Sequence, residues 1–229
     1  MARLYLFAEG QTEQTFANSV LSPHLAKHGV CLHKPVLIAH ARKKGKVHRG
    51  GGRKYVPMKN DILRFTAQEK GGDVFFTTMI DLYALPNDFP AREEAEELRH
   101  DPYRRVGRLE QAWSDDIGDR RFIPFIQLHE YEAYLFTKPG EFDLFYPNSQ
   151  KQIAKLQEIA DSVQSPELID DGRSTAPSKR INDVFPDYER AKTTIGPQVG
   201  ESIGIQVIRS KCPHFDGWLT ALEQLGQHG

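Results

Sequence analysis

The chain has 229 residues, close to the size at which single cores stop growing, so we expect one domain spanning residues 1–229. Hydrophobic residues form 39% and charged residues 27% of the sequence, which excludes the composition of a disordered protein. The 30 Lys and Arg residues nearly balance the 31 Asp and Glu residues, giving a formal net charge of −1. Any polyanion must therefore be bound by a local basic patch.

The cysteine content and the lack of long apolar runs indicate the cellular compartment in which the protein is expected. The two cysteines, Cys31 and Cys212, are too few for a disulfide framework and lack the paired spacing of a zinc site. The N-terminus carries no basic and apolar leader, and no apolar run approaches the length of a membrane span. We therefore expect a soluble, cytoplasmic protein with reduced thiols and no membrane partner.

Strands and helices are predicted in alternation from the N-terminus. Residues 3–8 form a short apolar strand, and apolar residues at helical spacing predict a helix over 12–27 that Pro23 should end or kink. A second strand is expected over 30–39 and a second helix over 59–68.

The next strand, over 73–80, is apolar throughout, which is typical of a strand covered on both faces, and it ends at Asp81. Polar helices are expected from residue 91 and over 106–116, and a fourth strand over 122–128. This alternation predicts an α/β core over 1–136, a mostly parallel sheet flanked by helices.

After Thr137 the pattern changes to short helical pieces separated by Pro and Gly, over 149–163, 177–184, 198–209 and 215–225. No low-complexity linker precedes them, so we expect residues 137–229 to form a mainly helical extension of the same domain. In this extension Cys212-Pro-His-Phe215 and Trp218 are expected to pack the last helix, and His214 is expected to be structural.

Acidic residues stand where three of the predicted strands end: Glu9, Asp81 and the pair Glu130 and Glu132. In open α/β sheets the functional crevice lies outside the carboxyl ends of the strands. Any one acid there could simply be solvated. Several acids brought together repel one another, and a divalent cation with a preference for oxygen ligands, Mg²⁺ or Mn²⁺, removes that cost.

The same residues resemble a known arrangement. Glu9-Gly-Gln-Thr-Glu13 after the first strand, Asp81 after a central strand and a later Glu resemble the Toprim arrangement of topoisomerases, primases and overcoming-lysogenization-defect (OLD) nucleases. More closely, five ordered motifs resemble the family named domain of unknown function 4276: Glu9-Gly-Gln-Thr-Glu13, Thr78-Met-Ile-Asp-Leu-Tyr-Ala-Leu-Pro86, His129-Glu-Tyr-Glu-Ala133, Ala176-Pro-Ser-Lys-Arg180 and Cys212-Pro-His-Phe215. The resemblance implies a Toprim-like fold and metal-dependent phosphodiester chemistry, with Glu9 and Asp81 as catalytic residues.

The chain departs from the Toprim pattern at Tyr83, which replaces the second acid of the Asp-x-Asp motif and removes a usual Mg²⁺ ligand. Glu13 or Asp88 could take its place. Glu130 and Glu132 would share a face if the strand continued through them and would diverge if a helix had already begun, in which case one could be only a cap.

A run of basic residues supplies the local patch. Seven Lys or Arg residues and several glycines lie between residues 42 and 54. This segment is expected to be either a solvated loop or a clamp on the phosphate backbone of DNA or RNA. The residues expected to bind nucleic acid are Arg42, Lys43, Lys44, Lys46, Arg49, Arg53 and Lys54, together with Arg180. Lys179 lies near the start of a helix predicted after Pro177, whose N-terminus could accept an anion. A single such lysine more often faces solvent, but the family resemblance implies that Lys179 offsets charge on the scissile phosphate.

These features favour a Mg²⁺-dependent nuclease in which Glu9, Glu13, Asp81, Glu130 and Glu132 are the candidate metal ligands. The family resemblance further implies an AAA or SMC-like ATPase as partner, in phage defence or DNA repair, and no nucleotide-binding motif is present for independent ATP hydrolysis. Two alternatives stay open: a non-catalytic nucleic-acid-binding subunit of such an ATPase, and a metal-dependent phosphatase acting on small substrates.

Overall fold

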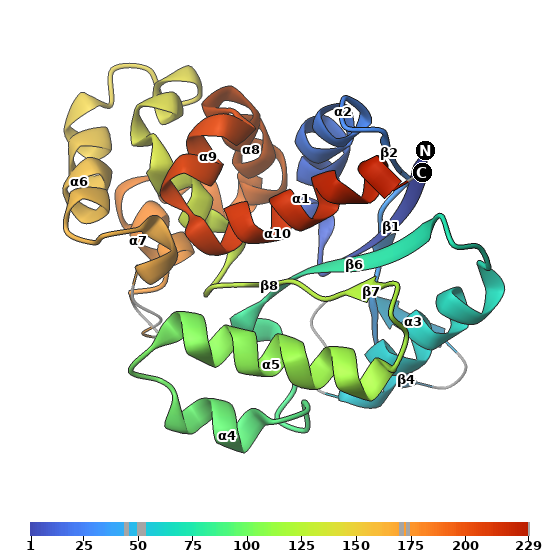
Figure 1. Cartoon of the computed structure of the whole chain (residues 1–229). Coiled ribbons are helices and arrows are strands. Elements are labelled where there is room, and N and C mark those ends of the chain that lie inside the picture. Colours follow the sequence, from blue (N-terminus) through green and yellow to red (C-terminus); the bar gives the residue numbers. More distant parts are fainter. Residues whose placement is uncertain (44–45, 50–53, 170–171, 173–174, 229) are drawn as a thin grey trace.

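Six parallel strands form the central sheet of the computed structural model (Figure 1). The structure describes residues 1–43, 46–49, 54–169, 172 and 175–228, and only the backbone of residues 39–43, 46–49 and 228. Strand β1 (Ala2–Ala8) pairs on one side with β2 (Val30–Leu32) and β3 (Val36–Leu37), and on the other with β6 (Val74–Asp81). Strand β6 in turn pairs with β7 (Phe122–Ile123) and β8 (Ile126–Gln127).

Each edge of the sheet, or outer track, consists of two short strands where the sequence pattern predicts one. These are β2 and β3 beside β1, and β7 and β8 beside β6. The strand expected over 30–39 is interrupted before β3, next to Pro35, and the strand expected over 122–128 is interrupted at Pro124. A proline has no N–H for the ladder and is tolerated at sheet edges, which explains why both breaks fall on outer tracks. Beyond β3 the chain forms an antiparallel ribbon, β4 (Ala39–Lys43) and β5 (Lys46–Arg49).

Side chains of β1 alternate between two hydrophobic cores. Leu4, Leu6 and Ala8 belong to one core, whereas Phe7 belongs to the other. The first core is covered by α1 (Gln11–Phe16), α2 (Ser22–Ala26), α8 (Tyr188–Ile203), α9 (Ile205–Lys211) and α10 (Pro213–Gln224). The second is covered by α3 (Tyr55–Gln68), α4 (Arg92–Glu97) and α5 (Pro102–Ile117). The sheet is thus mostly parallel with helices on both faces, as the pattern predicts.

The C-terminal part is helical, also as predicted. It includes the 3₁₀ helices η3 (Tyr131–Thr137) and η4 (Pro139–Leu144), and the helices α6 (Gln150–Asp161) and α7 (Pro177–Val184). The helix expected over 198–209 is instead divided between α8 and α9. Gly204 separates them with a φ of 82°, in the left-handed region that glycine adopts at little cost.

The helix does not end at Pro23, but its regular α-helical hydrogen bonding is interrupted just before this residue. A π turn, η1 (Ala17–Leu21), joins α1 to α2, and the Ser22 N–H donates to the Ala17 carbonyl. Pro23 then lies in the first turn of α2, where its missing N–H costs no helical bond. Within the described ranges, no helix has both the length and the apolarity required to span a bilayer.

Candidate metal centre

The parallel sheet brings the first two strand-end acids together. Glu9 follows β1, and Asp81 is the last residue of the neighbouring strand β6. The Glu9 N–H donates to the Met79 carbonyl at 3.0 Å. The Asp81 N–H donates to Glu9 Oε2 at 2.9 Å. Strand pairing therefore fixes both residues at the carboxyl edge of the sheet.

The chain turns sharply at the end of β8, before the second pair of acids. His129 is buried and has a φ of 67°, a left-handed conformation that is costly for a residue with a Cβ and is often found at functional sites. After this turn Glu130 is extended and Glu132 lies in the first turn of η3. The strand does not continue through the pair, so the two side chains diverge.

Glu130 and Glu132 consequently have different partners. Glu130 accepts hydrogen bonds from the N–H and, at 3.1 Å, the hydroxyl of Ser178, in the first turn of α7. The N-terminal turn expected to receive an external anion thus holds Glu130 in this structure. Glu132 is 4% exposed and accepts from the Tyr188 hydroxyl at 3.3 Å.

Glu13 joins the cluster from α1. Its side chain is buried, and its Oε2 accepts from the Gly10 N–H at 2.9 Å, so it also closes the first turn of the helix. All five predicted metal-ligand candidates lie in one electrostatic cluster, because Asp81 interacts electrostatically with each of the other four acids. Their role as metal ligands stays a prediction.

Asp81 is held by two donors that the sequence pattern did not reveal. Its Oδ1 accepts from Gln127 Nε2 at 2.6 Å and from the Tyr131 N–H at 3.1 Å. Gln127 is fully buried at the end of β8, and Tyr131 begins η3. The carboxylate that ends the central strand is therefore fixed in orientation by its neighbours on the adjoining track.

Burial and repulsion by neighbouring acids raise the pKa values of four acids of the cluster. Burial, reinforced by neighbouring acids, raises the pKa of Glu9 and of Glu13 to about 7 and that of Glu132 to about 8. The same two causes raise the pKa of Asp81 well above its ordinary value. At neutral pH the cluster therefore retains protons that a divalent cation would displace.

Lys192 of α8 supplies positive charge to this cluster, and sequence reasoning missed it. Burial favours its neutral form, but the charges of Glu132 and Glu130 outweigh that effect and raise its pKa. Lys192 lies one helical turn after Tyr188, which donates to Glu132. That spacing could have indicated Lys192 only if the start of α8 had been predicted.

The oxygen donors of the cluster suit Mg²⁺ or Mn²⁺ in chemistry. In the described part of the chain, however, the group of three whose ligand atoms all lie within 4.8 Å of one another is His24, His28 and Glu223. Coordination by three acids of the cluster therefore requires their oxygens to move closer together than they stand.

The predicted phosphate-binding residues of α7 directly follow Ser178 in the chain. Lys179 is half exposed, and its Nζ is 4.0 Å from Glu189 Oε2. Arg180 Nε donates to the Thr175 carbonyl at 2.7 Å. The roles expected for Lys179 and Arg180 stay predictions.

Tyr83 occupies the position of the second Asp-x-Asp acid, and Glu13 and Asp88 are the candidate substitutes for that acid. Tyr83 is 38% exposed, and its ring stacks on His129 with centroids 5.6 Å apart. Asp88 accepts from the Tyr55 N–H at 3.0 Å and so caps the start of α3. Of the two candidate substitutes for the second acid, Glu13 interacts electrostatically with Asp81, and Asp88 is held at the start of α3.

The basic segment 42–54 includes part of the β4–β5 ribbon, where a loop was expected. The ribbon contains Arg42, Lys43, Lys46 and Arg49, whose side chains lie outside what the structure describes, as do Lys44 and Arg53 altogether. Lys54 is exposed just before α3. Contacts of this segment with nucleic acid stay a prediction.

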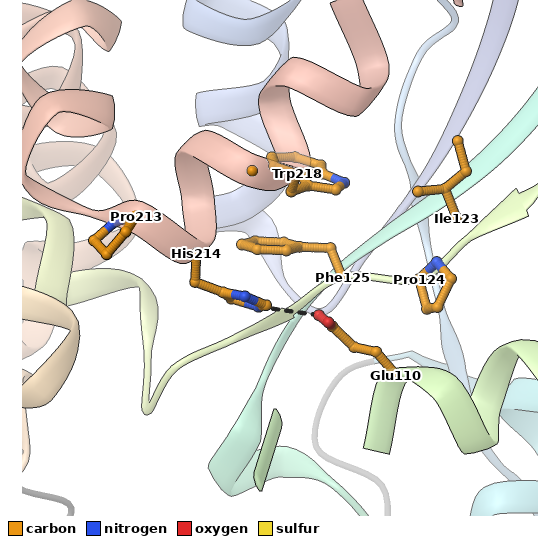
Figure 2. Close-up of a pocket in the computed structure, with 8 residues that line it drawn as sticks. Glu110, Ile123, Pro124, Phe125, Pro213, His214 and Trp218 are labelled. Carbon is orange, nitrogen blue, oxygen red and sulfur yellow. Dashed lines mark hydrogen bonds and ion pairs between the residues drawn. The ribbon is translucent and has the colours of Figure 1, made fainter. Parts of the chain in front are cut away.

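A small cavity of about 270 Å³ lies at the outer track of the sheet, between α5 and α10 (Figure 2). His214 Nε2 is 3.1 Å from Glu110 Oε1 and 3.2 Å from the Ile126 carbonyl, and Glu110 accepts the Ile126 N–H at 2.8 Å. These side chains cover the polar edge of β8. His214 is held by these contacts, as expected of a structural residue, and Phe215 and Trp218 are buried as expected.

Comparison with known proteins adds the family. The model described as "Domain of unknown function (DUF4276)" matches residues 8–223. The chain belongs to this family. A solved structure, the C-terminal region of the OLD protein of Xanthomonas campestris pv. campestris, covers 100% of this chain and 99% of its own at 14% identity and a TM-score of 0.40. No curated protein sequence matches.

The family match extends over all the strand-end acids. It begins at Ala8, the last residue of β1, and ends at Glu223 in α10. Glu9, Asp81, Glu130 and Glu132 all lie inside it. The region matched by the DUF4276 family therefore includes both the α/β core and the helices that contain Ser178, Tyr188 and Lys192.

Proposed function

We propose that this chain is a Mg²⁺-dependent or Mn²⁺-dependent nuclease that cleaves phosphodiester bonds at the carboxyl edge of its sheet. The observation that supports the proposal is the electrostatic cluster of five acids at the carboxyl edge of the sheet. Burial and neighbouring acids raise the pKa of four of them, Glu9, Glu13, Asp81 and Glu132. Such a cluster is unfavourable by itself and becomes favourable around a divalent cation.

Glu9, Asp81 and Glu132 are the residues that would hold the cation. Glu130 and Glu13 each already accept hydrogen bonds at a helix start, so we assign them a supporting role. When bound, the cation supplies an activated water and offsets charge on the phosphate. Glu9 and Asp81 are positioned for this by the Asp81 N–H and by Gln127 and Tyr131.

Positive charge in the protein would bind and orient the substrate. Lys192, whose charge acts on Glu130, Glu132 and Asp81, would offset negative charge on a phosphate bound at the carboxyl edge of the sheet. The basic segment 42–54 would bind the phosphate backbone, with an affinity that falls steeply with salt. An AAA or SMC-like ATPase would provide any ATP-driven step, in phage defence or DNA repair.

Cleavage assays test the proposal. Plasmid DNA, single-stranded DNA and RNA are incubated with the wild type and Mg²⁺ or Mn²⁺, with and without the partner ATPase. The variant Asp81→Asn should lose more than about 100-fold in rate, beyond the loss typical of outer-shell changes. Glu93→Gln, an exposed acid on α4, is the matched control and should cleave normally. Absence of cleavage under every condition, or full activity of Asp81→Asn, rejects the nuclease.

A non-catalytic nucleic-acid-binding subunit of such an ATPase is the second candidate, and Tyr83 is the observation that favours it. The position of the second Asp-x-Asp acid carries an exposed ring that stacks on His129 and offers no carboxylate. This alternative predicts salt-sensitive nucleic-acid binding that is equal in Mg²⁺ and in a chelator and is unchanged in Asp81→Asn. Fluorescence anisotropy with labelled oligonucleotides distinguishes the two candidates.

A further inference from the structure

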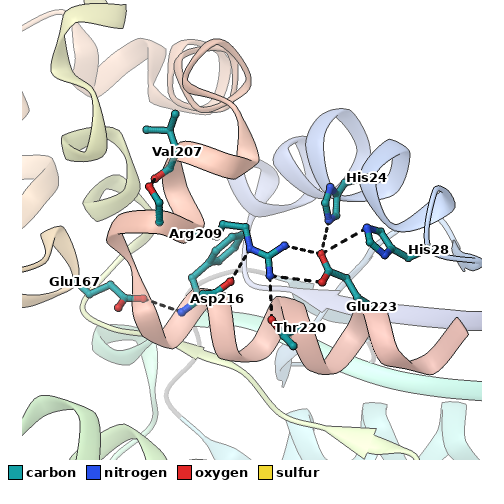
Figure 3. Close-up of polar contacts among 10 residues, drawn as sticks. His24, His28, Glu167, Val207, Arg209, Asp216, Thr220 and Glu223 are labelled. Atoms are coloured by element: carbon teal, nitrogen blue, oxygen red, sulfur yellow. Dashed lines mark hydrogen bonds and ion pairs between the residues drawn. The ribbon is translucent and has the colours of Figure 1, made fainter. Parts of the chain in front are cut away.

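Two histidines and a glutamate converge where the first and last helical segments meet (Figure 3). His24 belongs to α2, and His28 follows it by four residues in the turn after that helix. Glu223 lies in α10, and its Oε1 is 2.6 Å from His24 Nε2 and 3.7 Å from His28 Nε2. One ligand atom from each residue lies within 4.8 Å of the others. Both imidazoles thus direct Nε2 at the same carboxylate oxygen.

The donor set is that of a transition-metal site. Two neutral imidazole nitrogens and one carboxylate oxygen are the three protein ligands of many zinc centres with an open fourth position. The side chains of His24 and Glu223 are 10% and 12% exposed, whereas that of His28 is 38% exposed. An ion could therefore enter past His28 and be held between largely buried ligands. The mixed nitrogen and oxygen set favours Zn²⁺ over Mg²⁺, which prefers oxygen alone.

Arg209 holds the glutamate in place. Its Nη1 donates to Glu223 Oε1 at 2.8 Å, its Nε to Asp216 at 2.6 Å and its Nη2 to the Thr220 hydroxyl at 3.0 Å. Asp216, Thr220 and Glu223 lie along one face of α10, so the guanidinium follows that face as Figure 3 shows. A partner of this kind orients a metal ligand from outside the coordination shell.

The charge of the group is suited to a cation. With neutral imidazoles, the two carboxylates of Asp216 and Glu223 exceed the single positive charge of Arg209 by one. The negative charge that remains lies next to the converging ring nitrogens. Cation binding therefore reduces the electrostatic imbalance of this group.

The group is separate from the acidic cluster. His28 lies just before Val30, which pairs with Ala2 at the start of β1, whereas Glu9 follows the end of that strand. A strand of seven residues spans roughly 20 Å. The two groups thus stand at opposite ends of the sheet, and the inference does not rest on the proposed nuclease.

We propose that His24, His28 and Glu223 form a binding site for a transition-metal dication of the Zn²⁺ class, which ties α2 to α10. The bound ion links residues 199 positions apart in the chain. Because the unfolded chain does not bring these ligands together, ion binding stabilises the folded state.

To test the site, the metal-free full chain is titrated with Zn²⁺ or Co²⁺ as the only transition metal, in the presence of excess Mg²⁺. Binding is followed by calorimetry, by the visible absorption of bound Co²⁺ and by thermal unfolding. The wild type should bind one ion and unfold at a higher temperature with it. His28→Gln changes the most exposed ligand and should lose at least about tenfold in affinity. His100→Gln, an exposed histidine elsewhere, and Asp81→Asn, in the acidic cluster, should bind as the wild type does.

Two results would overturn the proposal. One is the absence of Zn²⁺ and Co²⁺ binding by the folded wild type. The other is binding that survives His28→Gln but is lost in Asp81→Asn, which would assign the ion to the acidic cluster. Circular dichroism of His28→Gln, expected to match the wild type, ensures that lost affinity reflects the missing ligand. A His24→Gln variant that folds should show the same loss of binding as His28→Gln.

Discussion

The backbone N–H of Asp81 donates to the side chain of Glu9 at 2.9 Å. One strand-end acid is therefore oriented by the main chain of the next strand, and the pair is as rigid as the β1–β6 pairing that carries it. Sites built on strands and their ends are held more precisely than sites built on loops. The carboxyl edge of the sheet is thus a preorganised acidic surface that the helical C-terminal region covers.

Gln127 is expected to control metal affinity without touching the ion. Its Nε2 donates to Asp81 Oδ1 at 2.6 Å from a fully buried position. Gln127→Met keeps the size of the side chain and removes the donor, so Mn²⁺ affinity should fall by about 10-fold to 100-fold. Calorimetry of Mn²⁺ binding measures this. Gln68→Met, at the exposed end of α3, is the matched control. Equal affinity in the two variants would contradict an orienting role for Gln127.

Metal binding is expected to tighten as pH rises. Burial and neighbouring acids raise the pKa of Glu9 to about 7 and that of Glu132 to about 8, so protons compete with the cation below those values. Affinity for Mg²⁺ should increase between about pH 6 and pH 8.5, by roughly tenfold per pH unit for each proton released. Calorimetry in buffers of different ionisation enthalpy counts the protons. A binding constant independent of pH in this window would contradict raised pKa values in the cluster.

The same pKa shifts predict the opposite trend for the metal-free protein. A carboxyl whose pKa is raised on folding stabilises the fold fully below its ordinary pKa of 4.5, and that contribution is lost as pH rises through the folded value. The contribution of Glu9 and Glu132 should therefore decline from about pH 5 to pH 8.5. Thermal unfolding with and without Mg²⁺ should show a stabilisation by Mg²⁺ that grows with pH. Asp81→Asn, which removes one of the repelling acids, should reduce both trends.

Two lysines can be compared directly as sources of positive charge for a phosphate. Lys192 interacts electrostatically with Glu130 and Glu132 of the acidic cluster. Lys179 is instead half exposed and lies beside Glu189. Lys192→Met should lower the cleavage rate by at least about tenfold. Lys179→Met makes the same change one helix away and should have the smaller effect. The reverse order would assign the phosphate contact to Lys179, as the sequence motif predicts.

The sequence predicts the strand-end acids because their placement follows from local rules. An apolar strand that stops at an acid needs only its own residues to be recognised, and parallel pairing then places Glu9 and Asp81 at one edge. The hydrogen bonds of Gln127 and Ser178 to the acids, and the electrostatic interaction of Lys192 with them, depend on how distant segments pack. Ser178 meets Glu130 across 48 residues, for example, and no periodicity encodes that contact.

The fold shows the same division between local and distant information. Most helices and strands were predicted, since hydrophobic periodicity and turn residues are local signals. The π turn before Pro23 and the ribbon β4–β5 were not predicted. The π turn keeps Leu21 and Leu25 in the core on either side of a proline, and the ribbon contains charges that the pattern assigns to a loop.

Gly200 is expected to be essential for the packing of α8 beside the site. A Cβ at this position would lie 3.3 Å from the ring of Phe16 and would collide with the hydroxyl of Tyr131. The backbone N–H of Tyr131 holds Asp81, so the collision would also press on the acidic cluster. Gly200→Ala should therefore destabilise the fold by about 1–3 kcal/mol, a typical cost of overpacking.

Gly107→Ala, at an exposed helical position with open space around it, should instead stabilise the protein by up to about 1 kcal/mol. Thermal unfolding measures both, at roughly 2–4 °C per kcal/mol for a chain of this length. Equal shifts in the two variants would show that α8 can move away from Tyr131 without cost.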